Sequence, residues 1–236
     1  MLGLDTATAD AALAITQGGE PVVERLVEPL AAGRPSHATA LLSEIEAVVA
    51  GTGGWGRIDL IAVGVGPGTF TGLRIGIATA RALGQGLGKP IAGVGSLAAL
   101  ARGIGSRPDA AGRLRLAVID ARRREAFAAL HGEDGHEVWE PFVASPAALG
   151  ERLETLAEPP LAAGDGSLRF RQELESAGAE VLSEDAPEHR MAARHICALA
   201  AGAPHRTDAI TPIYLRRPDA ELWRERDRSG RTDTRT

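Results

Sequence analysis

A glycine-rich turn near the middle of the chain is the first candidate for chemistry. Residues 66–69 (Gly-Pro-Gly-Thr) follow an apolar, β-branched stretch, 58–65, and precede a helical pattern that ends at Leu87. Free N–H groups at a helix start attract anions, so this arrangement is suited to phosphate. The sequence lacks the Lys-Ser or Lys-Thr of a Walker motif and the acidic residue of a dinucleotide site. A phosphate site and a purely structural turn therefore both remain open.

Two aspartates end what read as the first strands of two similar halves. Asp5 closes residues 2–5 and Asp120 closes residues 114–120, and each is followed by a polar turn and a second strand. In folds built from two such halves, the turn after the first strand of each half binds phosphate, although aspartate also closes ordinary turns. Both turns lack glycine, which would bare the backbone to a phosphate. The candidate residues of this vestigial nucleotide or phosphate site are Asp5, Thr6, Gly66, Gly68, Thr69 and Asp120.

Histidine and cysteine spacings give no assembled active site. No two of the six histidines stand four apart, so the sequence has no His-x-x-x-His metal face. His195 and Cys197 are two apart on a predicted helix and point to different faces, which favours a buried cysteine over a nucleophile and its base. We expect no catalytic residue, no metal site and no ATP turnover by the chain alone.

Composition limits the class of protein. Of 236 residues, 44% are hydrophobic and 24% charged, which is typical of a soluble globular protein. A net charge of −5 argues against an autonomous nucleic-acid binder, so the chain alone is expected to bind nucleic acid only weakly. One cysteine excludes a disulfide framework. No apolar run reaches membrane length and no charged leader precedes the first strand, so we expect a cytoplasmic protein without membrane contact.

The predicted elements repeat. Strands are expected at 2–5, 11–16, 21–28, 58–65 and 91–94, with helices at 36–50, 69–87 and 96–102. After a boundary at 103–112, strands follow at 114–120, 125–131 and 137–143, with helices from 145, from 167 and over 191–201. Two such copies predict an α/β fold of two ribonuclease-H-like halves, as in the actin/Hsp70/sugar-kinase (ASKHA) superfamily. The predicted domains are 1–104 and 105–215, followed by a poorly ordered Arg-rich tail, 216–236.

The central stretch, residues 66–76 (GPGTFTGLRIG), resembles the bacterial TsaB (YeaZ) family. Four further segments share the resemblance: 4–8 (LDTAT), 94–97 (VGSL), 119–122 (IDAR) and 212–216 (PIYLR). It implies a non-catalytic subunit of the complex that forms N6-threonylcarbamoyladenosine at position 37 of tRNAs reading ANN codons. Arg122-Arg123-Arg124 is more basic than the usual version of that turn.

The resemblance also implies partners. A TsaD-like catalytic paralogue would be docked and activated by this chain, a TsaE-like ATPase would join the assembly, and tRNA would be met only through the complex. Without the paralogue, a homodimer is expected. ATP and a metal ion would belong to the partner subunits, so no cofactor is expected on this chain alone.

Two other classes stay open. A small-molecule kinase of the ASKHA fold would need a working cleft and would hydrolyse ATP steadily. A metallopeptidase-like protein would need ligands that the histidine spacing does not supply, and metal analysis would detect its ion.

A ridge of small residues predicts close packing of the second helix. Residues 72, 76, 80, 84 and 88 are glycine or alanine at a spacing of four, and each interior glycine costs roughly 0.8–1.0 kcal/mol relative to alanine. Either a partner or the protein's own sheet must approach this ridge. We expect the partner, with a small-residue face of the first helix beside it. The predicted partner-binding residues are His37, Ala40, Ser43, Ala47, Gly72, Gly76, Ala80, Leu83, Gly84 and Leu87.

Overall fold

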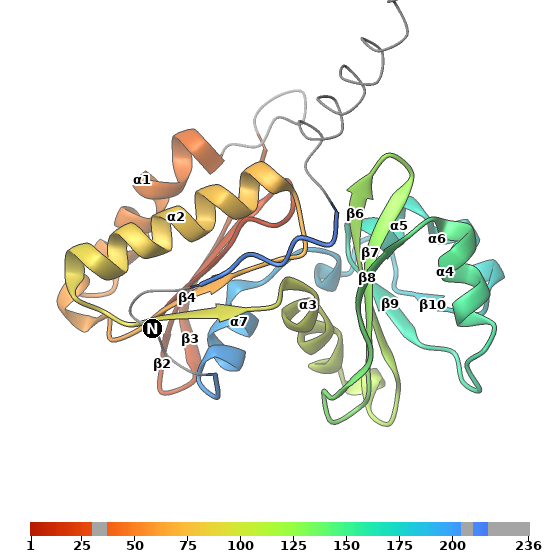
Figure 1. Ribbon diagram of the computed structural model, residues 1–236. Coiled ribbons are helices and arrows are strands. Elements are labelled where there is room, and N and C mark those ends of the chain that lie inside the picture. The colour runs from red at the N-terminus through yellow and green to blue at the C-terminus, as the bar shows by residue number, and fades with distance from the viewer. Residues whose placement is uncertain (30–36, 204–209, 217–236) are drawn as a thin grey trace, which may run out of the picture.

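The computed structural model describes residues 1–29, 37–203 and 210–216, and it contains two five-stranded sheets of the same topology (Figure 1). The first half consists of β1 (Leu2–Asp5), β2 (Ala11–Gln17), β3 (Glu20–Val27), α1 (His37–Gly51), η2 (Trp55–Arg57), β4 (Ile61–Gly64), α2 (Phe70–Leu87), β5 (Ile91–Val94) and α3 (Ser96–Gly105). The second consists of η3 (Pro108–Ala110), β6 (Arg115–Arg122), β7 (Glu125–His131), β8 (Glu137–Ala144), α4 (Pro146–Leu153), β9 (Leu161–Ala163), α5 (Asp165–Arg169), α6 (Arg171–Ser176), β10 (Glu180–Val181), η4 (Pro187–His189) and α7 (Ala193–Ala200). Of the expected tail, 216–236, Arg216 is described and pairs with Glu125, and residues 217–236 lie outside the described residues.

Each sheet has three antiparallel strands followed by two parallel ones. The first sheet has the order β3-β2-β1-β4-β5. Read from the matching edge, the second has the order β8-β7-β6-β9-β10, so each of its strands corresponds to one strand of the first. β1 pairs antiparallel with β2 and parallel with β4, and β6 does the same with β7 and β9. The ribonuclease-H-like duplication expected from the sequence is therefore confirmed.

Alternating side-chain size along β2 fixes the two faces of the first sheet. Leu13 and Ile15 pack with α1 and α2, whereas Ala12 and Ala14 lie on the face that α7 covers. Because successive side chains of a strand point to opposite faces, one sequence pattern makes a thick layer on one side and a close approach on the other. The absent side chain of Gly3 extends this approach, since a Cβ there would meet Cys197 and Ala193 of α7.

The two halves exchange helices. α3 follows the first sheet in sequence but packs on β6 and β7 of the second, and α7 ends the second half but packs on β1 and β2 of the first. Both helices lie between the sheets and join one hydrophobic cluster with side chains from each (Figure 1). The boundary at 104/105 stays a prediction, and the shared core makes the halves interdependent.

Several elements differ from expectation. The strand predicted at 58–65 is shorter, because residues 58–60 only lead from η2 into β4. The helix predicted from residue 167 is two short helices, α5 and α6, and strands β9 and β10 were not expected. These strands have three and two residues, too few to show a period.

The small-residue ridge of α2 faces the protein's own sheet. Gly72, Gly76, Ala80 and Gly84 are all buried. A Cβ on Gly76 would collide with the Thr6 hydroxyl, and one on Gly84 would meet Ile91. Leu83 and Leu87 are half-buried against the same core. The sheet therefore supplies the close approach that the glycines require, and it covers Gly72, Gly76, Ala80 and Gly84. Partner binding through the ridge stays a prediction.

The small-residue face of α1 does point outward. Ser43 and Ala47 are exposed and Ala40 is half-buried, whereas Leu41 and Ile45 enter the core. His37 begins the helix, but its side chain lies outside the described residues. Within the described ranges, no helix combines the length and apolar character needed to cross a membrane.

Candidate functional site

The first-half turn is filled by the protein itself. Asp5 is buried at the end of β1, where its Oδ1 accepts a hydrogen bond from the Ala7 N–H (2.8 Å) and its Oδ2 accepts one from Ser96 Oγ (2.6 Å). Gly64, on the neighbouring strand β4, leaves the space that this carboxylate occupies. One oxygen of Asp5 thus holds the turn after β1, and the other joins β1 to the start of α3.

The glycine turn, residues 66–69, also packs against the first-half turn. The Thr69 N–H donates to the Ala7 carbonyl (2.8 Å), and Gly68 approaches Ala7 so closely that a Cβ would overlap it. Thr6 Oγ1 donates to the Gly72 carbonyl (2.7 Å), and Ser96 Oγ accepts from the Gly66 N–H (3.2 Å). Of the two interpretations of the turn, its contacts favour the structural one for Asp5, Thr6 and Gly66.

In the second half, charged side chains surround the corresponding turn. Asp120 Oδ1 accepts from the Arg122 N–H (2.8 Å), and Oδ2 accepts from Arg169 Nη1 (2.7 Å). Asp165, at the start of α5, accepts a hydrogen bond from the Asp120 N–H (3.0 Å). Burial raises the pKa of Asp165, and the nearby Asp120 carboxylate raises it further, although backbone hydrogen bonds oppose the shift. Two neighbouring carboxylates and two arginines therefore meet at the ends of β6 and β9.

The β6–β7 turn holds three arginines in a rare conformation. Arg122, Arg123 and Arg124 have φ angles of 63°, 53° and 60°, and all three are exposed. The left-handed helical conformation costs a residue with a Cβ roughly 1–2 kcal/mol, and glycine is the usual occupant. The turn consequently holds its basic side chains at an energetic cost.

A cleft of about 400 Å³ lies between the start of α2, the β6–β7 turn and the segment 213–216. Its lining residues are Gly68, Thr69, Phe70, Thr71, Asp120, Ala121, Arg122, Arg123, Phe127, Ile213, Tyr214, Leu215 and Arg216. Ile213 N–H donates to the Val65 carbonyl (2.8 Å) and Arg216 pairs with Glu125 (2.8 Å), which holds the segment in place. The structure thus brings together Gly68, Thr69 and Asp120 of the candidate residues, whereas Asp5, Thr6 and Gly66 are not part of the lining.

Sequence reasoning missed several residues at these sites. Ser96 hydrogen-bonds to Asp5, and Gly64 leaves room for the Asp5 carboxylate. Arg169 and Asp165 are hydrogen-bonded to Asp120. Ser96 lay in a motif that the sequence pointed to, residues 94–97, and Gly64 lay in the stretch 58–65, but neither was linked to Asp5. These contacts depend on strand pairing that no local pattern encodes.

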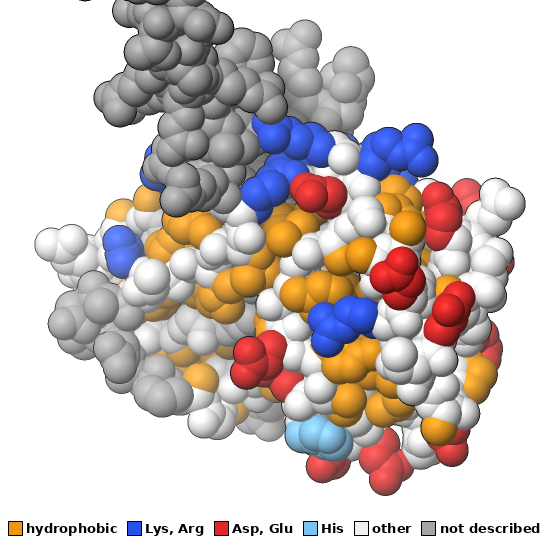
Figure 2. Space-filling view, turned by 45° about the vertical axis from the view of Figure 1, so that its right-hand side comes forward, with side chains coloured by type: hydrophobic (Ala, Val, Ile, Leu, Met, Phe, Trp, Pro, Cys, Tyr) orange, Lys and Arg blue, Asp and Glu red, His pale blue; other side chains and the backbone are white. Residues whose placement is uncertain are grey.

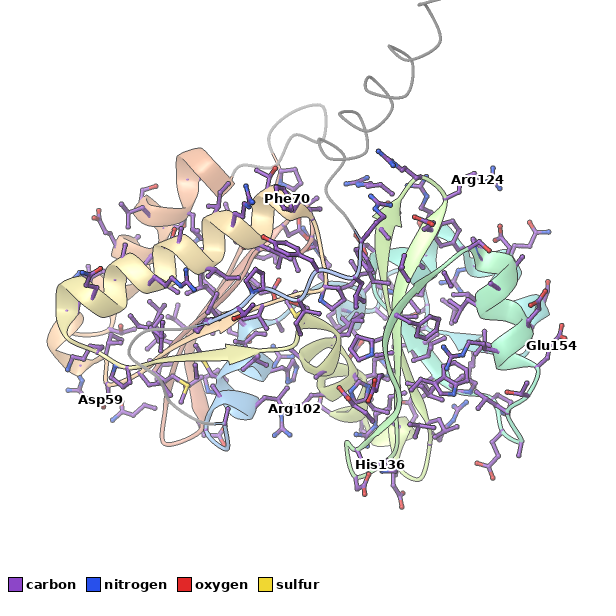
Figure 3. All side chains as sticks on the ribbon, in the orientation of Figure 1. Asp59, Phe70, Arg102, Arg124, His136 and Glu154 are labelled. Carbon is purple, nitrogen blue, oxygen red and sulfur yellow. The ribbon has the colours of Figure 1, made fainter. Side chains whose placement is uncertain are left out.

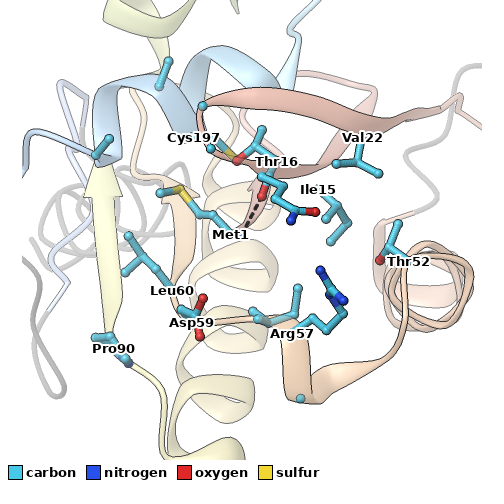
Figure 4. Close-up of a pocket in the computed structure, with 17 residues that line it drawn as sticks. Met1, Ile15, Thr16, Val22, Thr52, Arg57, Asp59, Leu60, Pro90 and Cys197 are labelled. Atoms are coloured by element: carbon cyan, nitrogen blue, oxygen red, sulfur yellow. Dashed lines mark hydrogen bonds between the residues drawn. The ribbon is translucent and has the colours of Figure 1, made fainter.

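A larger cavity of about 670 Å³ opens at the other end of the first sheet (Figure 4). Arg57 and Asp59 line it together with Leu60, Pro90 and Cys197. Burial raises the pKa of the Cys197 thiol, so this cysteine is a packing residue rather than a nucleophile. Among the described residues, no group of three or more His, Cys, Asp or Glu side chains could hold a metal ion.

Two buried histidines predict loss of stability in acid. Burial, followed by Arg194 and Arg102, lowers the pKa of His195 to about 4 from an ordinary 6.5, and burial with Arg115 and His136 lowers the pKa of His131. The unfolded chain binds these protons first, so the stabilisation is complete above about pH 6.5 and is lost as pH falls toward 4, by up to about 3 kcal/mol for His195. Denaturant titrations from pH 7.5 to 4 should show this slope, and His195→Gln should flatten it. An unchanged acid limb in the variant would contradict the assignment.

Comparisons with known proteins identify the relatives of this architecture. Residues 27–158 match the family model described as TsaD: tRNA N6-adenosine threonylcarbamoyltransferase. The Escherichia coli tRNA threonylcarbamoyladenosine biosynthesis protein TsaB is 31% identical over 171 residues, 70% of this chain and 71% of that protein. An uncharacterised Mycobacterium leprae protein is 35% identical over 166 residues, 69% of this chain but 44% of its own length.

Solved structures agree with this placement. YeaZ from Pseudomonas aeruginosa superimposes with a TM-score of 0.69 over 90% of this chain and 98% of its own, at 24% identity. A hexokinase of the ROK family from Thermus thermophilus, 12% identical, shares the ASKHA fold alone, with a TM-score of 0.51 over 85% of this chain and 97% of its own. The YeaZ structure shares the fold, and the sequence similarity to E. coli TsaB shows that the chain belongs to the TsaB (YeaZ) family.

Proposed function

We propose that this protein is a non-catalytic subunit of the complex that forms N6-threonylcarbamoyladenosine at position 37 of tRNAs reading ANN codons, and that it docks and activates a TsaD-like catalytic paralogue. The similarity to E. coli TsaB across 70% of the chain carries the assignment to this pathway. A tRNA-modifying role places the protein in the cytoplasm.

The filled first-half turn supports the non-catalytic role. A kinase of this fold must admit phosphates at both turns, yet Gly68 and Thr69 cover Ala7, and Asp5 is hydrogen-bonded within the protein. The described residues also offer no cluster of ligands to a metallopeptidase ion. ATP and metal are therefore assigned to the partner subunits, a TsaD-like enzyme and a TsaE-like ATPase, and not to this chain.

The outer face of α1 and α2 is the surface that we propose for docking. It consists of exposed residues that point away from the sheet: Leu42, Ser43, Ala47, Ala78 and Ala82. Leu42 is 52% exposed, an unusual position for a large hydrophobic side chain, and its small neighbours let another helix approach closely. In the absence of the paralogue, a second copy of the chain would occupy the same face.

Substitutions on this outer face are expected to abolish docking without unfolding the chain. Leu42→Arg and Ala82→Arg add charge at exposed positions, so the free energy of unfolding should change by no more than about 0.5 kcal/mol. Affinity for the co-expressed TsaD-like subunit, measured by size-exclusion chromatography and calorimetry, should fall at least tenfold. Ala147→Arg, on exposed α4 of the other half, is the matched control and should bind normally.

Reconstitution tests the function itself. The chain alone should neither modify tRNA nor hydrolyse ATP steadily. With ATP and the threonylcarbamoyl-adenylate donor supplied, adding the chain to the TsaD-like and TsaE-like subunits should restore modification. Steady ATP hydrolysis by the isolated chain would favour the kinase instead. Failure to bind the TsaD-like subunit would refute the proposal.

A further inference from the structure

Positive charge concentrates around the cleft of an otherwise acidic protein. Arg122, Arg123 and Arg216 line it, and three more arginines, Arg74, Arg124 and Arg169, lie next to lining residues. Asp120, Glu125 and the buried Asp165 are the carboxylates paired with or adjacent to this group. Lys and Arg side chains gather at the upper end in Figure 2, the end at which Figure 3 labels Phe70 and Arg124. The local surplus favours an anionic ligand.

The cleft also contains a place for a base. Tyr214 is 41% exposed and packs against Phe70 with ring centroids 5.2 Å apart, and the Arg74 guanidinium lies 3.8 Å above the Phe70 ring. Aromatic and guanidinium planes of this kind stack on unpaired bases. At the same wall, α2 begins at Phe70 without a side-chain cap from Thr69, and Thr69, Phe70 and Thr71 all line the cleft.

We propose that this cleft binds a nucleotide of a single-stranded RNA segment, with its phosphates on the β6–β7 arginines and its base on Tyr214. The choice of RNA as the source rests on the proposed role in tRNA modification, but the structure also favours a strand over a free nucleotide. The turn that would hold a free nucleotide's terminal phosphates is filled by residues 66–69. The exposed arginines instead lie on the rim, where a strand continues.

The conformation of the turn gives a variant that removes charge without harming the fold. Glycine adopts a positive φ without strain, so Arg123→Gly/Arg124→Gly should be at least as stable as the parent. Arg57→Ala/Arg102→Ala removes the same charge from exposed positions away from the cleft and is the matched control. For the base platform, Tyr214→Leu removes the ring, and Tyr214→Phe keeps it.

The test is a titration of full-length chain with labelled tRNA, a single-stranded oligoribonucleotide, ATP and AMP. Binding of the chain alone should be weak, no tighter than about 10⁻⁶ M at physiological salt. The double-glycine variant should lose about tenfold in RNA affinity at low salt, with a salt dependence shallower by about 1.4 in log–log slope. Tyr214→Leu should also weaken RNA binding, whereas Tyr214→Phe and the control should not.

Three results would overturn the proposal. Equal losses in the turn variant and the control would indicate charge alone, and unchanged RNA binding in the turn variant would exclude the cleft. ATP or AMP binding as tightly as RNA, with the same variant pattern, would assign the cleft to a free nucleotide. Because the turn variants keep the outer face of α1 and α2, their binding to the TsaD-like subunit reports on the proposed function separately.

Discussion

Replacing Ala80 by arginine is expected to unfold the protein. Ala80 is 0% exposed, on the face of α2 that packs against the first sheet within the cluster of Leu4, Leu13 and Ile61. A guanidinium there must lose its hydration or force the helix off the sheet, because buried apolar side chains surround this position. The cost should exceed about 4 kcal/mol, a large part of the 5–15 kcal/mol that stabilises a typical domain.

Ala82→Arg is the comparison that gives this result its meaning. Ala82 is exposed two residues along the same helix, so the same substitution there should leave the melting temperature nearly unchanged. Circular dichroism melts of both variants, followed by size-exclusion chromatography with the TsaD-like subunit, separate folding from docking. A folded Ala80→Arg variant that loses its partner would restore the interpretation that the ridge meets another protein.

The α2 ridge shows how far sequence reasoning extends. A spacing of four correctly indicates that small residues share one side of the helix and that something approaches it closely. The spacing does not tell whether the protein's own sheet or a partner's helix packs against the ridge, because both require small side chains there. The long-range contacts that decide this, Gly76 with Thr6 and Gly84 with Ile91, join segments with no common local pattern.

The fold was predictable because its elements repeat in order. β1 ends at Asp5 as expected and β6 runs two residues past Asp120, and both aspartates accept a hydrogen bond from the backbone N–H two residues later. Their different roles were not predictable. Asp5 binds Ser96 across 91 positions of sequence, and Asp120 binds Arg169 across 49, so each environment depends on tertiary pairing.

The arginine turn has the same limitation. Three consecutive arginines were visible in the sequence as an unusually basic turn. Their left-handed backbone was not, because arginine carries no preference for positive φ and the conformation comes from closing β6 onto β7 across an irregular register at Asp120 and Arg122.

Gly64→Ala should be among the most damaging single-methyl additions in the chain. A Cβ at this position of β4 would overlap the Asp5 carboxylate and press on Ser96 Oγ. Asp5 cannot move aside, because its oxygens are hydrogen-bonded to the Ala7 N–H and to Ser96. Overpacking of a tight core costs about 1–3 kcal/mol, and the fixed carboxylate places the expected loss at or above the upper end. Urea denaturation measures it.

A double-mutant cycle tests that cause directly. Asp5→Ala alone should cost about 2–3 kcal/mol, because it leaves the Ala7 N–H and the Ser96 hydroxyl without their acceptor. It also empties the space that the new methyl needs, so Gly64→Ala/Asp5→Ala should be more stable than the sum of the two losses by about 1–3 kcal/mol. Additive losses would show that the methyl collides with something other than Asp5. Gly86→Ala is the control, because Gly86 is an exposed position of α2 with no neighbouring atom within 4 Å of a new Cβ. This substitution should stabilise the protein by about 0.8–1.0 kcal/mol. A gain at Gly86 together with a loss at Gly64 would show that the loss comes from the packed turn and not from replacing a glycine.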